Sequence, residues 1–427
     1  MKNVLFVSYY WPPAGGVSTN RIVHFAHYLE KYGWNVSVLT PTSALHPFKD
    51  ESLIELVRDK TVYATGNLSF KPTKNTQSKD LIPYTFTEPT YSSSFNDWIK
   101  KWIKFNLIPD TRIFWSFFVN KHIKKVLKEE SFDLIFSSSP PQTNHIIASR
   151  LSKKYKIPWV ADLRDPWSDV FWLKKINLRL PLLSWIDRII EKRTLNSASA
   201  LVTVTKEWER KYQLINPNVH CIYNGYNSEF HDSIKISKKK NEFVILYSGS
   251  ISYQQNPSAF LHAVKEVINS NEDFKKKVKI VWLGNFPTFL NSMIKEYGLD
   301  EFCHFQPFTT MAESLHMMKE SNLLLSIGFG HDANTGVIHS KLFDYIATKR
   351  PILGLGLEYE ASEILEKSGL GKSFQYTDKN HIKDYLLKVF SDKENTQEIN
   401  ESFIKDFSRE AQTQQLAQIF DDVWSRR

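Results

Sequence analysis

The stretch of sequence that decides the fold is Asn334-Thr335-Gly336-Val337-Ile338-His339-Ser340-Lys341-Leu342-Phe343-Asp344-Tyr345-Ile346-Ala347. Residues 322–327, just before it, form an apolar run of strand length, and residues 328–332 form a glycine-containing loop. After Ser340 the apolar residues recur at helical spacing, which predicts a helix that begins near Ser340 and is capped by the Ser340 hydroxyl. A strand, a glycine-containing loop and a helix in this order make half of a nucleotide-binding unit.

Two charged residues lie in the first turn of this predicted helix. Lys341 stands beside the helix N-terminus, where free N–H groups and a positive charge favour a phosphate. Asp344, one turn further on, can accept a hydrogen bond from a ribose hydroxyl. The same pair has the i, i+3 spacing of a solvated ion pair that contributes little to stability. Both interpretations fit this motif by itself.

Length and composition indicate two domains. A chain of 427 residues exceeds one ordinary hydrophobic core and suits two domains of about 200 residues each. Lysine and arginine number 55 against 46 aspartates and glutamates, which gives a net charge of +9. A basic protein favours phosphates or an anionic surface. No nucleic-acid module is recognisable in the sequence, so nucleic acid is not an expected partner.

Neither a membrane span nor a cysteine-based site is expected. No apolar run is long enough to cross a bilayer, and Val4-Leu5-Phe6-Val7 is too short and unsuitably flanked for a signal peptide. We therefore expect a cytoplasmic protein. Cys221 and Cys303 are far apart and each lies in a strand-like run, so neither a disulfide framework nor a metal site is expected.

The chain opens with a strand, a loop and a helix. Residues 3–9 predict a buried strand, and the loop that follows contains Gly15 and Gly16. Residues 19–31 predict a helix, and residues 34–39 predict a second strand. Paired glycines let a ligand approach the backbone closely, but they also suit a tight turn with positive φ. The motif by itself favours the turn.

A long and less regular region follows. Residues 43–109 have mixed composition and weak periodicity, which predicts an irregular insertion. Aromatic and basic residues then share the segment Trp98–Lys128. Amphipathic helices of this kind can lie in an anionic lipid interface, where each basic residue contributes about 1 kcal/mol. They are equally typical of helices with one buried face and one solvated lysine face.

Two further predicted strands end in polar residues. Residues 132–136 form the first strand, and His145 lies in the first turn of the helix after it. The second strand, residues 158–161, leads directly into Asp162-Leu163-Arg164-Asp165. Open α/β sheets place ligand chemistry at the C-terminal ends of their strands. For this cluster a catalytic role and an internal ion pair with Arg164 are equally consistent with the sequence.

The second half repeats the alternation of strands and helices. A lysine-rich run at residues 235–241 predicts a linker between a domain of residues 1–235 and a domain of residues 241–405. Each domain alternates strands with helices, so the fold class is α/β with two Rossmann-like halves. Residues 406–427 predict a final helix with one apolar face, which packs back on the first domain.

Taken in order, these motifs resemble those of the GT-B glycosyltransferases, in particular the retaining, metal-independent glycosyltransferase family 4 of bacterial surface-polysaccharide synthesis. The resemblance covers almost the whole chain. It is carried by Pro12-Pro13 with Gly15-Gly16 and Arg21, Ser139-Pro140-Pro141 with His145, Ala161-Asp162-Leu163-Arg164-Asp165-Pro166-Trp167, Asn224-Gly225-Tyr226, Tyr247-Ser248-Gly249-Ser250, and Ser340 to Ala347 with Pro351-Ile352. It implies two Rossmann-like domains that face each other across a cleft.

The resemblance also implies roles. The second domain would bind a nucleoside-diphosphate sugar as co-substrate, and the first would bind a glycan or polyprenyl-linked glycan acceptor, with no metal or other cofactor. Gly16 would approach the donor diphosphate, and His145 would contact the transferred sugar. Lys341 would neutralise the leaving diphosphate, and Asp344 would contact the ribose. The remaining candidates are Asp162 as a base or acceptor ligand, and, for substrate binding, Gly15, Arg21, Arg164, Asp165, Gly249, Ser250, Gly336, Val337 and Ser340.

Two positions depart from the family pattern. Gly336 stands eight residues before Asp344, where the first glutamate of the family signature is expected. Backbone N–H groups of Thr335 to Val337, or the side chain of Asp332, are candidates to replace it. The basic pair after the glycine loop of the second domain is also absent, since residues 250–255 offer only Tyr253, Gln254 and Gln255. Diphosphate binding would then depend more on the helix N-terminus and its lysine.

Glycosyl transfer needs stabilisation of the charge on the departing diphosphate and on an oxocarbenium-like sugar. The resemblance implies that Lys341, the helix dipole and Arg164 supply it, and that the leaving phosphate oxygen takes the acceptor proton. An epimerase or phosphorylase-like enzyme is a rival, but no lysine-cofactor signature is visible. A non-catalytic nucleotide-sugar or polysaccharide-binding subunit is the alternative that Gly336 makes credible. Trp98–Lys128 adds the expectation of a peripheral location on the inner face of the membrane.

Overall fold

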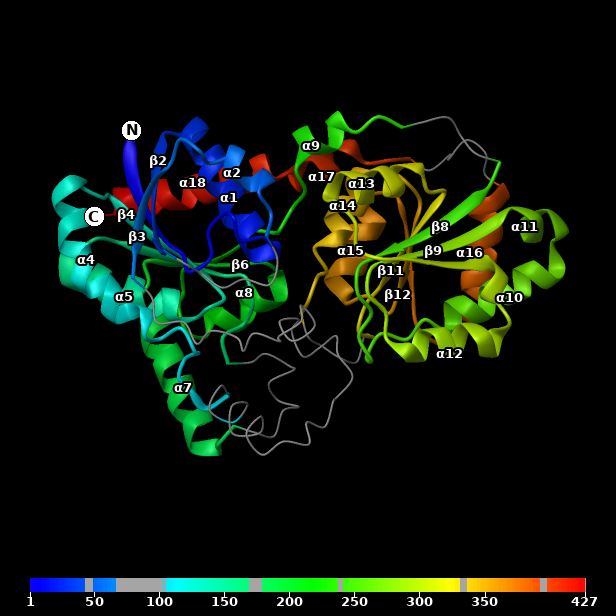
Figure 1. Ribbon diagram of the computed structural model, residues 1–427, viewed down its shortest axis with the longest axis horizontal. Helices are drawn as coiled ribbons and strands as arrows, with labels where there is room; N and C mark the ends of the chain where they lie inside the picture. Colours follow the sequence, from blue (N-terminus) through cyan, green and yellow to red (C-terminus); the bar gives the residue numbers. More distant parts are fainter. Residues whose placement is uncertain are drawn as a thin grey trace. The chain divides into compact units, whose positions relative to one another are not determined.

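The structure is a computed structural model, and it describes residues 1–42, 49–66, 102, 105–168, 179–236, 241–330, 336–391 and 398–426. The described chain divides into two compact units. The first unit holds the residues up to Asn224 together with Arg409–Arg427, and the second holds Gly225–Ser408. Each unit consists of a sheet with helices packed against it, as Figure 1 shows.

The sheet of the first unit has, within the described residues, seven parallel strands in the order β3-β2-β1-β4-β5-β6-β7. Strand β1 pairs in parallel with β2 on one side and with β4 on the other. The strand order therefore reverses between β1 and β4, and open α/β sheets bind ligands at such a point. The strands are β1 (Lys2–Val7), β2 (Trp34–Pro41), β3 (Thr61–Thr65), β4 (Leu134–Ser139), β5 (Trp159–Leu163), β6 (Ala200–Thr203) and β7 (Val219–Cys221).

Helices cover both faces of this sheet. Alternate side chains of a strand point to opposite faces, and Val4 and Phe6 of β1 share a core with the first and last helices of the unit. The last helix, α18, buries Leu416 and Phe420, whose ring lies 5.3 Å from that of Trp34. The helices are α1 (Val17–Tyr28), η1 (Leu29–Tyr32), α2 (Ser52–Glu55), α4 (Trp115–Glu129), α5 (Thr143–Tyr155), α7 (Pro181–Leu195), α8 (Lys206–Gln213) and α18 (Arg409–Ser425).

The predicted irregular insertion contains regular structure, which corrects the expectation for residues 43–109. Strand β3 and helix α2 lie within it, although residues 43–48, 67–101 and 103–104 are outside the described part. β3 was missed because four of its five side chains are at least partly exposed, so no buried face marks it in the sequence. Pairing with β2 at the edge of the sheet holds β3 in place.

The second unit contains a six-stranded parallel sheet in the described residues, in the order β10-β9-β8-β11-β12-β13. Here the strand order reverses between β8 and β11, so this sheet has its own topological switch point. The strands are β8 (Phe243–Ser248), β9 (Val278–Leu283), β10 (Cys303–Gln306), β11 (Leu323–Ile327), β12 (Ile352–Leu355) and β13 (Gly371–Phe374).

The helices of the second unit lie on both faces of its sheet, with α10, α12 and α16 on one face and α13, α14 and α15 on the other (Figure 1). The core under the first group is continuous with the strands and includes Phe260, Val264 and Trp282. The helices are α9 (Ser228–Ser233), α10 (Ser258–Ser270), α11 (Glu272–Lys277), α12 (Thr288–Tyr297), η3 (Asp300–Phe302), α13 (Met311–Glu320), α14 (Lys341–Ala347), α15 (Tyr359–Lys367), α16 (Lys379–Ser391) and α17 (Glu401–Asp406).

The second unit begins at Gly225, upstream of the linker predicted at residues 235–241. Helix α9 belongs to this unit because Lys319 on α13 donates hydrogen bonds to the backbone carbonyls of His231 and Ile234, the latter at 3.0 Å. Residues 237–240 of the predicted linker lie outside the described residues. Among the helices that the structure describes, none combines the length and the apolar character needed to cross a bilayer.

Candidate active site

The turn that leads from β4 into α5 lies at the C-terminal edge of the first sheet and carries His145. A distant carboxylate holds this turn, since Asp110 accepts hydrogen bonds from the Thr143 backbone N–H at 2.9 Å and the Thr143 hydroxyl at 2.8 Å. A carboxylate at a helix N-terminus satisfies free N–H groups and interacts favourably with the helix dipole. Burial raises the pKa of Asp110, and the hydrogen bonds from Thr143 oppose that shift. Asp110 thus fixes the start of α5, and His145 is held beside it.

The imidazole of His145 is completely buried and is held by two tryptophans and a serine. Its ring is stacked on that of Trp167, with centroids 6.0 Å apart, and lies 6.1 Å from that of Trp159. Its Nδ1 atom is 2.8 Å from the hydroxyl oxygen of Ser137, which also accepts a hydrogen bond from the Trp159 indole at 2.7 Å. Burial lowers the pKa of His145 to about 3, although nearby Asp162 opposes that shift. The ring is therefore neutral at physiological pH.

Several buried polar atoms around this turn have no hydrogen-bond partner among the described residues. They are Nε2 of His145, Oγ of Ser139, Oε1 of Gln142 and Oδ1 of Asn144. Buried polar groups in folded proteins are nearly always hydrogen-bonded. Four such atoms within one turn give it the capacity to bind the polar groups of a ligand.

A second layer of hydrogen bonds holds Trp167, which packs on His145. Its indole N–H donates to Asp187 of α7 at 3.1 Å, and its backbone N–H donates to the Tyr212 hydroxyl at 2.9 Å. The Tyr212 hydroxyl in turn donates to Glu191 at 3.1 Å, and Ser168 donates to the same carboxyl group. Burial raises the pKa of Glu191 to about 7. Helix α7 thus fixes the tryptophan that orients the histidine.

Arg21 and Asp162, both predicted site residues, form a closed ion pair instead of facing an open site. Both oxygens of Asp162 are engaged, by the Arg21 guanidinium at 2.8 Å and by the Ser138 hydroxyl at 2.6 Å. The other N–H groups of Arg21 donate to the backbone carbonyls of Ile222 and Tyr223 at 2.9 and 2.8 Å. These contacts favour a structural role for Asp162 over the predicted role as a base.

Arg164 and Asp165 form the neighbouring ion pair. The predicted internal pairing with Arg164 therefore holds for Asp165, whereas Asp162 pairs with Arg21. Burial raises the pKa of Asp165, and the Arg164 charge opposes that shift. Their side chains are 23% and 19% exposed, so this pair, unlike Arg21–Asp162, has atoms at the surface of the first unit.

The two glycines after β1 are required by the backbone. Gly16 is the N-cap residue of α1 and has φ +93°, a conformation that favours glycine. A Cβ atom on Gly15 would lie 3.0 Å from the Cβ of Asp50, so a side chain there would crowd the segment opposite. The interpretation as a tight turn with positive φ, which the sequence favoured, is confirmed for Gly16. Its approach to a diphosphate stays a prediction.

The loops after β8 and β9 are in close contact at the C-terminal edge of the second sheet. Gly249 has φ +145°, and a Cβ atom on Gly284 would lie 1.9 Å from the Gly249 carbonyl oxygen. Ser250, next to Gly249, is half-buried, and its carbonyl oxygen accepts a hydrogen bond from the Tyr247 hydroxyl at 3.1 Å. A side chain on Gly284 would separate the two loops, and both glycines have positive φ, so here too the backbone requires glycine.

Gln255, one of the side chains that replace the basic pair of the family, is held inside the second unit. Its Oε1 atom accepts from the Ser252 N–H at 2.8 Å, and its Nε2 atom donates to the Ile327 carbonyl at 2.6 Å. The side chain is 2% exposed. Gln255 therefore links the loop after β8 to β11, and it is not positioned to replace a basic phosphate ligand.

Lys341 and Asp344 lie together at the start of α14, as their spacing predicts. Their charged atoms are 3.5 Å apart, and the Lys341 and Asp344 side chains are 32% and 19% exposed. Nε2 of His231, from α9, lies 3.5 Å from the other carboxylate oxygen of Asp344. The carboxylate is thus oriented by two neighbours while part of its surface and that of Lys341 stays accessible. This arrangement suits a lysine that binds an anion and a carboxylate that binds a hydroxyl.

The remaining predicted residues lie just before α14. The helix begins after Ser340, as predicted, but the cap is wrong: Ser340 has helical φ and ψ, and within the described residues its hydroxyl makes no capping hydrogen bond. Gly336 has φ +63°, so the backbone adopts the left-handed conformation at the position where the family has its glutamate. Val337, beside it, is half-buried. A glutamate in place of Gly336 would be strained, which explains the departure from the family pattern in physical terms.

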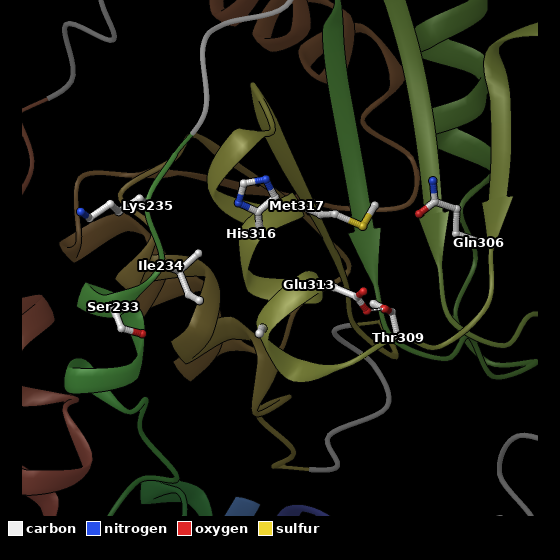
Figure 2. Close-up of a pocket in the computed structure, with 9 residues that line it drawn as sticks. Ser233, Ile234, Lys235, Gln306, Thr309, Glu313, His316 and Met317 are labelled. Atoms are coloured by element: carbon white, nitrogen blue, oxygen red, sulfur yellow. Dashed lines mark hydrogen bonds between the residues drawn. The ribbon is translucent and has the colours of Figure 1, made fainter.

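A groove of about 730 Å³ opens elsewhere on the second unit, between residues 233–235 and α13 (Figure 2). Glu313, His316 and Met317 of α13 line one side of it. Thr309, which follows β10, donates a hydrogen bond to Glu313. None of the predicted site residues lines this groove. Among the described residues, no group of three histidine, cysteine or acidic side chains is placed to hold a metal ion.

Sequence reasoning missed the residues that hold His145. Ser137 and Trp159 lie inside strands β4 and β5, where a sequence pattern predicts only core packing. Asp110 comes directly after the region predicted to be irregular, and nothing in the sequence connects it with Thr143. One feature of the sequence could have indicated these contacts. Ser137 and Trp159 both carry a polar atom, and a polar atom in a fully buried strand needs a hydrogen-bond partner.

Comparison with known proteins identifies the class. The model of Glycosyltransferase Family 4 matches residues 14–230. The chain belongs to glycosyltransferase family 4, and it is a glycosyltransferase. No curated protein matches the sequence significantly.

Solved structures show that the fold is GT-B. HepE from Anabaena in complex with UDP matches with a TM-score of 0.62 and 12% identity, over 99% of this chain and 100% of that one. Sucrose-phosphate synthase from Thermosynechococcus elongatus matches with a TM-score of 0.61 and 11% identity over 100% of both chains. TarM from S. aureus, solved with UDP, matches with a TM-score of 0.58 and 10% identity over 98% of this chain and 100% of that one. The predicted fold class and family are confirmed.

Proposed function

We propose that this glycosyltransferase is a retaining, metal-independent enzyme that moves a sugar from a nucleoside-diphosphate sugar to a glycan or polyprenyl-linked glycan acceptor in bacterial surface-polysaccharide synthesis. The observation that supports it best is His145, a buried neutral histidine with an unpartnered Nε2 atom, within the described residues, at the switch point of the first sheet. An uncharged imidazole nitrogen is a suitable partner for a sugar hydroxyl. It can bind the sugar without adding a charge beside it.

The donor is proposed to bind the second unit through Lys341 and Asp344. Lys341 supplies a positive charge to the departing diphosphate, and Asp344 accepts a hydrogen bond from a ribose hydroxyl. HepE, solved with UDP-glucose, shares the fold with a TM-score of 0.62, which makes UDP the first nucleotide to test. Gly336 leaves the position of the family glutamate without a side chain, so the backbone N–H groups around it are proposed to bind the donor sugar.

In the proposed reaction the bond between the anomeric carbon and the diphosphate oxygen breaks, and a bond to the acceptor oxygen forms on the same face. The leaving phosphate oxygen takes the acceptor proton, so no side-chain base is required. This agrees with the contacts of Asp162, whose two oxygens already accept hydrogen bonds from Arg21 and Ser138. Arg164, held by Asp165, is a second candidate cation for the departing charge.

A thermal-shift panel tests the donor site. UDP, GDP, ADP, CMP and dTDP are compared with and without magnesium, because a ligand at 100 times its dissociation constant adds about 2.7 kcal/mol to the free energy of unfolding. A rise in Tm with one nucleoside diphosphate, equal in EDTA and in magnesium, supports the proposal and names the base. A rise that requires magnesium contradicts metal independence.

Donor hydrolysis separates the enzyme from its main rival. A non-catalytic nucleotide-sugar or polysaccharide-binding subunit would show the thermal shift but would release no sugar when the donor is supplied without an acceptor. Slow release of free sugar by the wild-type protein supports the enzyme. The anomeric proton coupling of that sugar at the earliest time points then reports whether the configuration at the anomeric carbon is retained.

We also propose that the first unit binds an anionic membrane surface from the cytoplasmic side, as Trp98–Lys128 suggested. Trp98 lies outside the described residues, and α4 buries Trp115 and Ile123, which agrees with an ordinary core-facing helix there. Exposed apolar side chains lie on both helices: Phe117 of α4 is 68% exposed, and Leu182 and Trp185 of α7 are 65% and 61% exposed. α4 and α7 both pack on α5, so the lysines of α4 belong to the same unit.

Flotation with vesicles tests this surface. Wild-type protein is expected to float at low salt with vesicles that contain anionic lipid and to stay at the bottom of the gradient with neutral ones. Trp185→Ser is expected to reduce flotation, whereas Leu214→Ser, which changes a still more exposed apolar side chain outside α7, is the control. Failure of the wild-type protein to float at low salt argues against the surface.

A further inference from the structure

We propose that Ser137 and Trp159 are positioning residues that fix the tautomer of His145, so that the single proton of its neutral ring lies on Nε2. The proposal rests on the proposed function only for the identity of the ligand that meets Nε2. The tautomer itself follows from three side chains of the first unit, and nothing so far assigns a role to the serine or the tryptophan.

The chain of donors starts at Trp159. An indole N–H can donate a hydrogen bond but cannot accept one. Nε1 of Trp159 lies 2.7 Å from the Ser137 hydroxyl oxygen, so the hydroxyl accepts there. The serine still has one proton to donate, and Nδ1 of His145 lies 2.8 Å away. If the hydroxyl donates to Nδ1, that atom carries a lone pair, and the proton of the ring must be on Nε2.

The opposite tautomer, with the ring proton on Nδ1, leaves the Ser137 hydroxyl without an acceptor for its proton. With the ring proton on Nδ1, the Ser137 oxygen would accept two hydrogen bonds and its own proton would need another acceptor. Ser137 is completely buried, and the described residues offer its hydroxyl only the two partners named above. An unmade hydrogen bond of a buried hydroxyl is unfavourable. The arrangement therefore selects the tautomer with the proton on Nε2.

The fixed tautomer determines what the other ring nitrogen, Nε2, offers to a ligand. Nε2 is buried and has no partner within the described chain, so the fixed tautomer presents a donor there and not a lone pair. A ligand oxygen that meets Nε2 must accept the hydrogen bond. Stacking against Trp167 at 6.0 Å and contact with Trp159 at 6.1 Å hold the plane of the ring, so the direction of that donor is set as well.

Nitrogen NMR of protein labelled with ¹⁵N-histidine tests the tautomer directly, because protonated and unprotonated ring nitrogens have well-separated shifts. In the wild-type protein the His145 signals are expected to show Nε2 protonated and Nδ1 unprotonated from pH 5 to 8. In Ser137→Ala and Trp159→Phe both tautomers should become detectable. A proton on Nδ1 in the wild-type protein, or unchanged populations in both variants, would overturn the proposal.

A matched control is Ser149→Ala. Ser149 is buried on the same helix as His145, and its hydroxyl lies 2.9 Å from that of Ser197 and not in the hydrogen bonds that hold the imidazole. Ser149→Ala should leave the ¹⁵N shifts of His145 unchanged. The comparison separates the effect of losing any buried hydroxyl from the effect of losing the Ser137–His145 hydrogen bond. If Ser137→Ala fails to fold, Trp159→Phe, which keeps most of the ring, still decides the outcome.

Kinetics connect the tautomer to catalysis. Loss of one hydrogen bond that positions a donor is expected to lower kcat/KM about five- to tenfold in Ser137→Ala, while Ser149→Ala stays near the wild-type value. If the wild-type protein turns over no nucleotide sugar, the proposed function fails while the NMR result still stands. If it turns over donor but carries the proton on Nδ1, the inference fails and the function stands.

Discussion

Arg21 and Asp162 form an ion pair inside the first unit, with Nη2 of the arginine 2.8 Å from Oδ1 of the aspartate and neither side chain more than 2% exposed. The arginine comes from α1 and the aspartate from β5, and the remaining guanidinium donors bind backbone carbonyls that follow β7. The pair therefore joins three separate parts of the sheet edge. The pair is also linked to the strand that holds His145, because Ser138 donates to Asp162 and the preceding residue, Ser137, contacts the imidazole.

Asp162→Asn should destabilise the first unit strongly. Removing one partner of a buried ion pair leaves the other charge uncompensated, which typically costs about 3–5 kcal/mol. Urea unfolding measures the loss. The control is Glu401→Gln, which breaks an exposed pair with Lys349 and should change the free energy of unfolding by less than about 1 kcal/mol. An Asp162→Asn protein as stable as the wild type but inactive would instead favour the catalytic role.

Lys341→Ala should lower turnover without lowering stability. The side chain is 32% exposed and its charge lies 3.5 Å from Asp344, so the fold loses only a weak surface pair. Loss of a cation from the departing diphosphate typically costs about a hundredfold in kcat. Donor consumption and Tm are measured together, with Lys349→Ala, just beyond the C-terminal end of the same helix, as a control. Turnover within a few-fold of wild type in a folded Lys341→Ala protein would remove Lys341 from leaving-group stabilisation.

Restoring the family glutamate at position 336 should harm the protein. The backbone there has φ +63°, and a side chain in the left-handed region costs roughly 1–2 kcal/mol. Gly336→Glu is therefore expected to lower Tm and not to raise activity. Gly33→Ala gives the reference cost, since Gly33 has φ +83° and open space around its Cβ position. A Gly336→Glu protein that is as stable as the wild type and more active would contradict this explanation.

Stability should fall as pH rises through the titration of Glu191. Burial raises the pKa of this carboxyl from 4.5 to about 7, so between these values the folded chain holds a proton that the unfolded chain has lost. The free energy of unfolding then decreases with rising pH, by about 1.4 kcal/mol for each unit of pKa shift, and the contribution is gone above pH 7. Glu191→Gln should flatten this dependence between pH 5 and 8.

The control for the pH dependence is Glu363→Gln. Glu363 is 44% exposed and pairs with Lys367 on α15, so its removal should leave the pH profile unchanged. Urea unfolding at several pH values measures both variants against the wild type. If Glu191→Gln and wild type show parallel profiles, Glu191 is not the group that titrates.

Local patterns predicted most of the elements well. The helix predicted at residues 19–31 is α1 (Val17–Tyr28) followed by η1 (Leu29–Tyr32), and α14 begins directly after Ser340, as predicted. Strand β3 was not predicted, because its side chains are largely exposed and pairing with β2 holds it in place. The Ser340 cap was wrong because a serine before a helix caps it only with extended φ and ψ, and Ser340 is itself helical.

Sequence alone determined the alternation of strands and helices, the family, and the positions of His145, Lys341 and Asp344 at the ends of their strands and helices. Those properties depend on residues close together in the chain, where period and spacing are visible. Only the tertiary structure showed that Arg21 pairs with Asp162, 141 residues away, and that Trp159 and Ser137 hold His145. Such partners are selected by which strands lie side by side in the sheet, because hydrogen bonds act over about 3 Å whatever the separation in sequence.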